Sequence, residues 1–272
     1  MQHIAASLGE GRILISDGAW GTFLMAKGLE QGACPELWNA ARRAEVLDVA
    51  RSYVAAGSDL ITTNSFGGTR VRLREYGLDG RTRELNQAAA EISREAAGDS
   101  VHVMASIGPT GKLLITEEVS GQELYDAFAE QAQALEAGGA DACCVETMSA
   151  LDEAVLAVRA ARENTGLEVL CTFTYERAIN GVYHTMMGVT PAEMAQAIVA
   201  AGASVIGTNC GYGPADMVAI ARQLRAAAPD TPILVQANAG LPERRPDGLH
   251  YPESPQTMAE FVPALIAAGA NI

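Results

Sequence analysis

The chain has 272 residues, of which 49% are hydrophobic and 19% charged, so it can build a sizeable core. Its formal net charge of −14 argues against a surface for nucleic acid or anionic membranes, both of which attract basic residues. The sequence contains no apolar run near the roughly 18 residues of a membrane-spanning helix, and its first residues do not resemble a signal peptide. Five cysteines without disulfide-like spacing fit a reducing compartment. We therefore expect a cytoplasmic protein without nucleic-acid or membrane partners.

Short apolar segments typical of buried parallel strands alternate with alanine-rich helical segments along the whole chain. The predicted strands are 12–18, 60–66, 102–108, 142–148, 168–175, 205–211 and 233–240. Between them, 45–56 carries an apolar stripe at helical spacing, and Thr190-Pro191 and Ser254-Pro255 mark helix starts. Seven strand–helix units in a chain of this length predict an α/β fold, a (β/α)8 TIM barrel, with an open doubly wound sheet as the alternative.

A helix end with a glycine cap that leads into a strand recurs four times. The four copies are AAGSDL (55–60), GGADAC (138–143), AAGASV (200–205) and AAGANI (267–272). The first three precede predicted strands, and the fourth lies where an eighth strand would begin. Seven parallel strands would leave an apolar edge unpaired. We therefore expect residues 1–272 to form a single barrel domain whose eighth strand is only begun, and whose natural C-terminal tail is missing.

Polar residues gather at the predicted strand ends, where barrel enzymes build their active sites. They are Asp17, Gly18, Thr63, Asn64, 108–111, Glu146, Thr147, Asn209, Cys210 and Asn238. Cys210 follows an apolar strand among the glycines of GTNCGYG (207–213), so its sulfur is expected to face this mouth. A carboxylate that ends an apolar strand, as Glu146 does, is costly without a partner. Turn formation by Asp17 and loop capping by Asn64 and Asn209 are the structural alternatives.

Other chemistries find less support in the sequence. The first strand is not followed by a Gly-x-Gly-x-x-Gly turn, and the four histidines all lie away from strand ends, which disfavours dinucleotide binding and a thiol hydrolase. Cys143 and Cys144 are adjacent like a metal-binding pair, but alternation along a strand sends them to opposite faces. Cys144 then shares a face with Glu146. We expect core packing for both, and likewise for Cys34 and Cys171.

Seven segments together resemble one known family. They are ISDGAWGTFL (15–24), CPELWN (34–39), YVAAGSDLITTNSFGGTR (53–70), ASIGPTGKLL (105–114), VETMS (145–149), GTNCGYGP (207–214) and VQANAGLP (235–242). In this order, over nearly the whole chain, they resemble the homocysteine S-methyltransferase family, in particular the homocysteine-binding barrel of cobalamin-dependent methionine synthase.

The resemblance implies specific roles. Cys210 matches a catalytic zinc ligand of the family, and two further ligands come from a cysteine pair on strand eight, which here would lie beyond Ile272. Asp17, Gly18 and Glu146 match residues that hold the amino-acid end of homocysteine. We group Thr63, Asn64 and Asn209 with these as candidate substrate-binding residues, because they end neighbouring strands. A catalytic zinc site needs three protein ligands, and one cysteine does not supply them.

The implied reaction makes methionine from homocysteine. A free thiol with a pKa of about 8.5 is only a few per cent ionised at pH 7, and coordination to zinc removes its proton. GPTGKLL (108–114) resembles the cobalamin-linked branch, which implies a methylated corrinoid protein as the donor, with cobalamin on a separate protein or domain. S-methylmethionine, S-adenosylmethionine and betaine are the alternative donors. A non-catalytic amino-acid-binding barrel is the alternative of another class.

Overall fold

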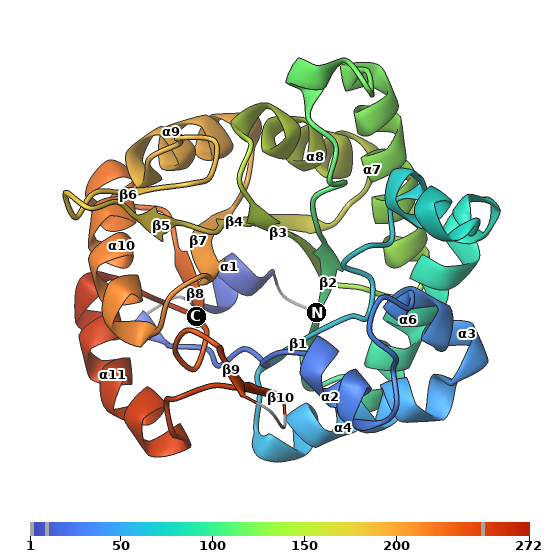
Figure 1. The fold of residues 1–272 in the computed structure, drawn as a ribbon, viewed down its shortest axis with the longest axis horizontal. Coiled ribbons are helices and arrows are strands. Elements are labelled where there is room, and N and C mark those ends of the chain that lie inside the picture. The colour runs from blue at the N-terminus through green and yellow to red at the C-terminus, as the bar shows by residue number, and fades with distance from the viewer. Residues whose placement is uncertain (1–2, 9–10, 246–247) are drawn as a thin grey trace.

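The computed structural model describes residues 3–8, 11–245 and 248–272. At its centre lies a curled parallel sheet whose strand order is β1-β2-β3-β4-β7-β8, surrounded by helices (Figure 1). The strands of this sheet are β1 (Leu60–Thr62), β2 (His102–Ile107), β3 (Ala142–Met148), β4 (Glu168–Phe173), β7 (Val205–Cys210) and β8 (Ile233–Ala237). The strands follow one another in chain order, so this sheet lacks the reversal of strand order that defines a doubly wound fold.

Two short antiparallel hairpins accompany the sheet. One pairs β5 (Glu176–Arg177) with β6 (Tyr183–His184), and the other pairs β9 (Glu243–Arg245) with β10 (Gly248–His250). Both come directly after strands of the curled sheet in the chain, β5 after β4 and β9 after β8. They are thus part of the connections that leave the carboxyl ends of the strands.

Longer helices alternate with the strands and cover the outer face of the sheet (Figure 1). The α-helices are α1 (Ile4–Ser7), α2 (Gly21–Ala26), α3 (Trp38–Ala41), α4 (Arg43–Ala56), α5 (Arg70–Leu73), α6 (Thr82–Ala97), α7 (Gly121–Ala137), α8 (Leu151–Asn164), α9 (Pro191–Ala201), α10 (Pro214–Ala227) and α11 (Pro255–Ala268). The predicted helix starts are confirmed, since Thr190 forms a capping box with Glu193 and the side chain of Ser254 accepts from the Thr257 N–H. None of the helices in the described ranges is long and apolar enough to cross a membrane.

Alternation along each strand divides the core into two layers. The layer inside the curl contains Leu60, Met104, Cys144, Leu170, Val205 and Leu234. The layer between the sheet and its helices contains Val145 and Cys171 together with Cys143. Cys143 and Cys144 therefore face opposite ways, as the alternation predicted.

The short helix α1 fills the amino end of the curl, where Figure 1 shows it inside the ring of strands. Ile4 and Leu8 pack into the inner layer. The buried carboxylate of Glu168, at the start of β4, accepts hydrogen bonds from the backbone N–H groups of Ile4 (2.5 Å) and Ala5 (3.0 Å). An acidic side chain at a helix N-terminus satisfies donors that lack partners within the helix. The chain thus closes the floor of the curl with its own N-terminal segment.

The prediction of a first strand over 12–18 is wrong. Within it the structure contains only an isolated parallel bridge between Ser16 and Leu60. The Ile15 N–H donates instead to the carboxylate of Asp59 at 2.9 Å. On its other side the segment meets the last residues of the chain, with Leu14 N–H donating to Asn271 O at 3.0 Å. Three backbone hydrogen bonds join Ile15 and Asp17 to residues 59–60, and they make a single bridge rather than a ladder.

The same C-terminal residues contact the opposite edge of the sheet. Val235 N–H donates to Ile272 O at 2.9 Å, and Asn271 N–H donates to Ile233 O at 2.8 Å. Residues 271–272 therefore lie between β8 and the segment around Leu14. The seven expected strands are accordingly reduced, in the described residues, to six, and the two edges of this sheet are bridged at the amino end by residues 271–272, where the eighth strand was expected to begin.

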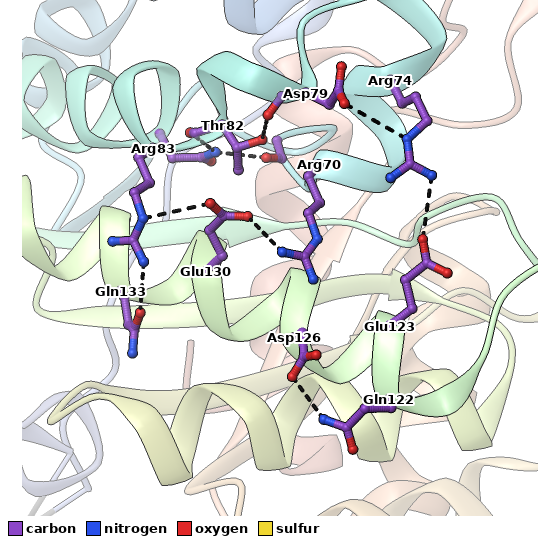
Figure 2. Close-up of polar contacts among 12 residues, drawn as sticks. Arg70, Arg74, Asp79, Thr82, Arg83, Gln122, Glu123, Asp126, Glu130 and Gln133 are labelled. Carbon is purple, nitrogen blue, oxygen red and sulfur yellow. Dashed lines mark hydrogen bonds and ion pairs between the residues drawn. The ribbon is translucent and has the colours of Figure 1, made fainter.

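Ion pairs join α7 to the segments that precede it on the outside of the sheet (Figure 2). Glu130 of α7 lies 3.4 Å from Arg70 and 3.6 Å from Arg83, and Glu123 lies 3.4 Å from Arg74. Exposed pairs of this kind contribute little, about 0–1 kcal/mol each. They orient α5 and α6 against α7, while the free energy of folding comes mainly from the apolar layers.

Candidate active site

Polar side chains form a second layer inside the curl, next to the inner apolar layer and closer to the carboxyl ends of the strands. On each strand an inward-facing apolar residue is followed two positions later by a polar residue, except on β7, where Gly207 intervenes before Asn209. The inward polar residues are Thr62, Ser106, Glu146, Thr172, Asn209 and Gln236. They lie toward the carboxyl ends of the strands, next to Asp17 and Cys210.

Asp17 is held in one orientation by three donors to the same oxygen. Its Oδ2 accepts from Trp20 Nε1 at 2.9 Å, from Thr62 N–H at 2.7 Å and from Thr62 Oγ1 at 2.9 Å. Its Oδ1 receives a longer contact, from Ser16 Oγ at 3.4 Å. Burial raises the pKa of Asp17 to about 6 although these hydrogen bonds oppose the change. Oδ1 is thus the oxygen with capacity left for a ligand.

Glu146 lies near the carboxyl end of β3 and is held from two sides. Ser106 Oγ donates to its Oε1, and Asn209 Nδ2 lies 3.3 Å from its Oε2. Burial raises the pKa of Glu146 to about 7, and the negative charge of Asp17 contributes to the increase. The two carboxyl groups are therefore close enough to repel each other. Such a pair favours a cationic ligand, because a cation relieves both the burial and the repulsion.

The thiol of Cys210 lies beside this pair, at the end of β7. Cys210 is partly exposed, and burial together with the charge of Glu146 raises the pKa of its thiol. Its Sγ lies 3.4 Å from Asn209 Nδ2 and 3.9 Å from Thr147 Oγ1. Cys210 and Thr147 both adopt left-handed backbone conformations, with φ of 57° and 60°. Such conformations are uncommon for residues other than glycine and cluster at functional sites.

The remaining predicted residues differ in how they reach the site. Gly18 follows Asp17, and a Cβ there would lie 3.1 Å from the Tyr53 hydroxyl, so glycine allows this close approach. Thr63 Oγ1 accepts from the Ser106 N–H at 3.0 Å and so supports the residue that holds Glu146. Asn64 is turned elsewhere: its amide donates to Pro35 O at 2.8 Å and to Asn39 Oδ1 at 2.9 Å. Its described contacts do not join it to the two carboxylates.

Sequence reasoning missed four residues that hold the carboxylates and the neighbouring amide: Trp20, Thr62, Ser106 and Thr172. Thr172 Oγ1 donates to Asn209 Oδ1 at 2.9 Å, as Thr62 and Trp20 do to Asp17. The signal was the period of two, since three of them lie two positions after an inward-facing apolar residue. Trp20 lies three positions after Asp17, and only the fold brings its indole nitrogen back to the Asp17 carboxylate.

Cys210 differs from the other cysteines in exposure. Cys34 is 6% exposed and Cys143, Cys144 and Cys171 at most 1%, so their expected packing role is confirmed. Within the described residues, there is no group of three or more histidine, cysteine, aspartate or glutamate side chains that could hold a metal ion. An open catalytic zinc site needs three protein ligands. Cys210 with its described neighbours therefore does not by itself fit zinc.

The Trp20–Asp17 hydrogen bond makes a prediction about stability. Trp20→Phe keeps an aromatic ring but removes a donor to a buried carboxylate, so the pKa of Asp17 should rise further. Unfolding monitored by circular dichroism should show a loss of about 1.5–3 kcal/mol at pH 8. The loss should be smaller at pH 5, where Asp17 is mostly protonated. Trp38→Phe is the control. The guanidinium carbon of Arg42 lies 4.4 Å from the centre of the Trp38 ring, and the stability lost in this variant should not change with pH in this way.

The curled sheet and the polar layer at its carboxyl edge define an α/β protein of the class whose active sites lie at that edge. The chain belongs to the homocysteine S-methyltransferase family, whose sequence model matches residues 14–272. It is similar to the methionine synthases of Mycobacterium tuberculosis and Mycobacterium leprae, with 33% identity to each over 275 residues and 94% of this chain. The match covers 22% of those proteins, so the chain spans about a fifth of their length.

Solved structures with the same fold include the homocysteine methyltransferase MmuM from Escherichia coli. Its metallated form superposes with a TM-score of 0.79 at 22% identity, over 98% of this chain and 92% of that one. Its oxidized form gives a TM-score of 0.78 at 22% identity, over 100% and 93%. At this level of identity the likeness establishes the shared fold.

Proposed function

We propose that the chain is the homocysteine-binding unit of a methyltransferase that converts homocysteine to methionine. The observation that carries the proposal is the pair of interacting carboxyl groups, Asp17 and Glu146, beside the partly exposed thiol of Cys210. Family membership and the identity with methionine synthases support it. We also propose that the curled sheet is a (β/α)8 barrel, with Leu14 and residues 271–272 at the positions of its first and eighth strands. The TM-score to MmuM supports that assignment.

The two carboxylates would bind the ammonium group of the substrate. Asp17 Oδ1 has capacity left, and Glu146, whose pKa the charge of Asp17 helps to raise, is the second acidic acceptor. An ammonium group carries three donors and one positive charge, which suit two acidic acceptors at one site. Fixing this end of homocysteine would hold its sulfur in a defined place for in-line attack on a methyl group. Gly18, Thr63 and Asn209 remain candidate binding residues on this rim, and Asn64 would have to turn its amide from Pro35 and Asn39 to join them.

In the reaction the sulfur–methyl bond forms as the bond between donor and methyl breaks, and the thiol proton leaves. We propose a methylated corrinoid protein as the donor, because GPTGKLL (108–114) resembles the cobalamin-linked branch. Zinc is the metal that the family resemblance implies for ionising the thiol, with Cys210 as one ligand. It would need two ligands that the described residues do not contain, so we route no step through it.

Binding of L-homocysteine to the 272-residue chain tests the proposal. Calorimetry should detect L-homocysteine and L-methionine but not N-acetyl-L-homocysteine, which keeps the thiol and lacks the ammonium group. Equal binding of the acetylated compound would contradict the role of the carboxylates. Absence of binding by all three would contradict the proposal as a whole.

The donor is tested separately, with the native protein, zinc and homocysteine. Methionine formation should be fastest with a methylated corrinoid carrier, compared with S-methylmethionine, S-adenosylmethionine and betaine. A faster reaction with one of these three would replace the corrinoid by that donor. Binding without turnover on any donor would identify a non-catalytic amino-acid-binding protein.

A further inference from the structure

Asn209 lies between the carboxylate of Glu146 and the thiol of Cys210 in the proposed site. Its Oδ1 accepts from Thr147 N–H at 3.1 Å and from Thr172 Oγ1 at 2.9 Å. Because a backbone N–H can only donate, these contacts fix which end of the amide is the oxygen. The Nδ2 group is therefore turned toward Glu146 and Cys210.

The Nδ2 group faces more acceptors than it has hydrogens. It lies 2.7 Å from Thr147 Oγ1, 3.3 Å from Glu146 Oε2 and 3.4 Å from Cys210 Sγ. An amide nitrogen carries two hydrogens, so it cannot serve three acceptors fully at once. The short contact to Thr147 takes one of them. Glu146 and Cys210 share the other, which agrees with their longer distances.

We propose that Asn209 is a positioning residue that couples ligand binding at Glu146 to the sulfur of Cys210. The proposal rests on the proposed function, in which an ammonium group binds Glu146. That ammonium would bring its own donors to the carboxylate and release the shared hydrogen of Asn209. The hydrogen then goes fully to Cys210 Sγ. Occupation of the amino-acid end thus fixes the sulfur in place without a direct contact between the ligand and Cys210.

The coupling is reciprocal, so it can be measured from the ligand side. If Cys210 receives the released hydrogen, removing its sulfur leaves that hydrogen without an acceptor when the ligand binds. It also leaves Asn209 free to hold Glu146 in the empty site. Both effects weaken the binding of an amino acid. In a variant that lacks the amide of Asn209, removing the sulfur of Cys210 should no longer change ligand affinity through this route.

A double-mutant cycle tests this with L-methionine, the product of the proposed reaction, in the presence of EDTA. Calorimetry gives Kd for the wild type, Cys210→Ala, Asn209→Ala and the double variant. Cys210→Ala should weaken binding on the order of threefold in the wild-type background and leave it unchanged in the Asn209→Ala background. Cys210→Ser should restore most of the affinity, because its hydroxyl oxygen accepts a hydrogen bond.

An equal loss in both backgrounds would show that Cys210 touches the ligand directly and would overturn the coupling, as would no loss in either. If Asn209→Ala fails to fold by circular dichroism, or abolishes binding, the side-chain amide of Asn209 is followed by 15N NMR in the wild type and in Cys210→Ala. One of its two protons should shift on addition of L-methionine, and the shift should differ without the sulfur. An amide that responds identically in the two proteins overturns the proposal. Absence of L-methionine binding by the wild type contradicts the proposed function instead.

Discussion

Asp17→Asn and Glu146→Gln should each weaken L-homocysteine binding about 10- to 100-fold and leave the protein folded. Each substitution keeps the shape of the side chain and removes one negative charge facing the ammonium group. A hydrogen bond to a charged group contributes about 1.5–3 kcal/mol, and 1.4 kcal/mol is a tenfold change in affinity. Calorimetry at pH 8 measures the effect. Glu168→Gln is the matched control, since Glu168 is a buried carboxylate at the amino end of the curl, where it accepts from the N–H groups of Ile4 and Ala5.

The same carboxyl groups give the prediction a dependence on pH. Their pKa values rise from 3.8 to about 6 in Asp17 and from 4.5 to about 7 in Glu146, so the folded protein holds more protons than the unfolded chain between these limits. Stability should therefore fall as the pH rises through this range. Ligand affinity should do the opposite and increase up to about pH 7, because the ammonium group needs ionised carboxylates.

The variants separate these two effects. Asp17→Asn and Glu146→Gln each remove a titrating group, so the pH-dependent part of the free energy of unfolding should shrink while ligand affinity is lost. A protein that becomes weaker in binding yet no less stable at pH 8 is the expected result. Unchanged affinity in both variants, or a loss as large in Glu168→Gln, would contradict the assignment of the site.

Most of what could be predicted from the sequence rested on the alternation of side chains along strands and on the positions at which strands end. Because side chains alternate with a period of two, the sequence alone placed Cys144 and Glu146 on one face and Cys143 on the other. It also placed Asp17, Asn209 and the partly exposed Cys210 at one edge, because parallel strands end together. The glycine caps followed from local chemistry in the same way, as the left-handed φ values of Gly57, Gly202 and Gly269 illustrate.

Contacts between distant segments could not be predicted this way. Asn64 follows β1 by two residues, and its amide turns to Pro35 and Asn39, which only the folded chain brings near. Segment 12–18 has the composition of a strand, yet the Ile15 N–H donates to the side chain of Asp59 and the pairing with Leu60 stays a single bridge. The hydroxyls of Ser106 and Thr172 were visible in the alternation but looked like ordinary strand residues without their partners.

Gly207 is the position at which a single methyl group should do the most damage to the fold. A Cβ there would lie 2.0 Å from the carbonyl oxygen of Leu234 on the neighbouring strand, closer than side chains approach backbone. Gly207 pairs with Leu234 inside the β7–β8 ladder, with a pair on either side, so relief requires the two strands to separate. Overpacking of this kind costs about 1–3 kcal/mol, occasionally more. We therefore expect Gly207→Ala to lower Tm by roughly 2–12 °C.

The damage should extend to the site, because Asn209 and Cys210 follow on the same strand and pair with Gln236 and Ala237. Gly207→Ala should thus reduce L-homocysteine affinity together with stability. Gly80→Ala is the matched control: Gly80 has open space around its missing Cβ and lies outside the left-handed region. That variant should be neutral or more stable by up to about 1 kcal/mol, since alanine restricts the unfolded chain. Melting curves for the two variants test this prediction. Equal Tm values would contradict it, because they would mean that β7 and β8 can separate at little cost and that glycine is not required at position 207.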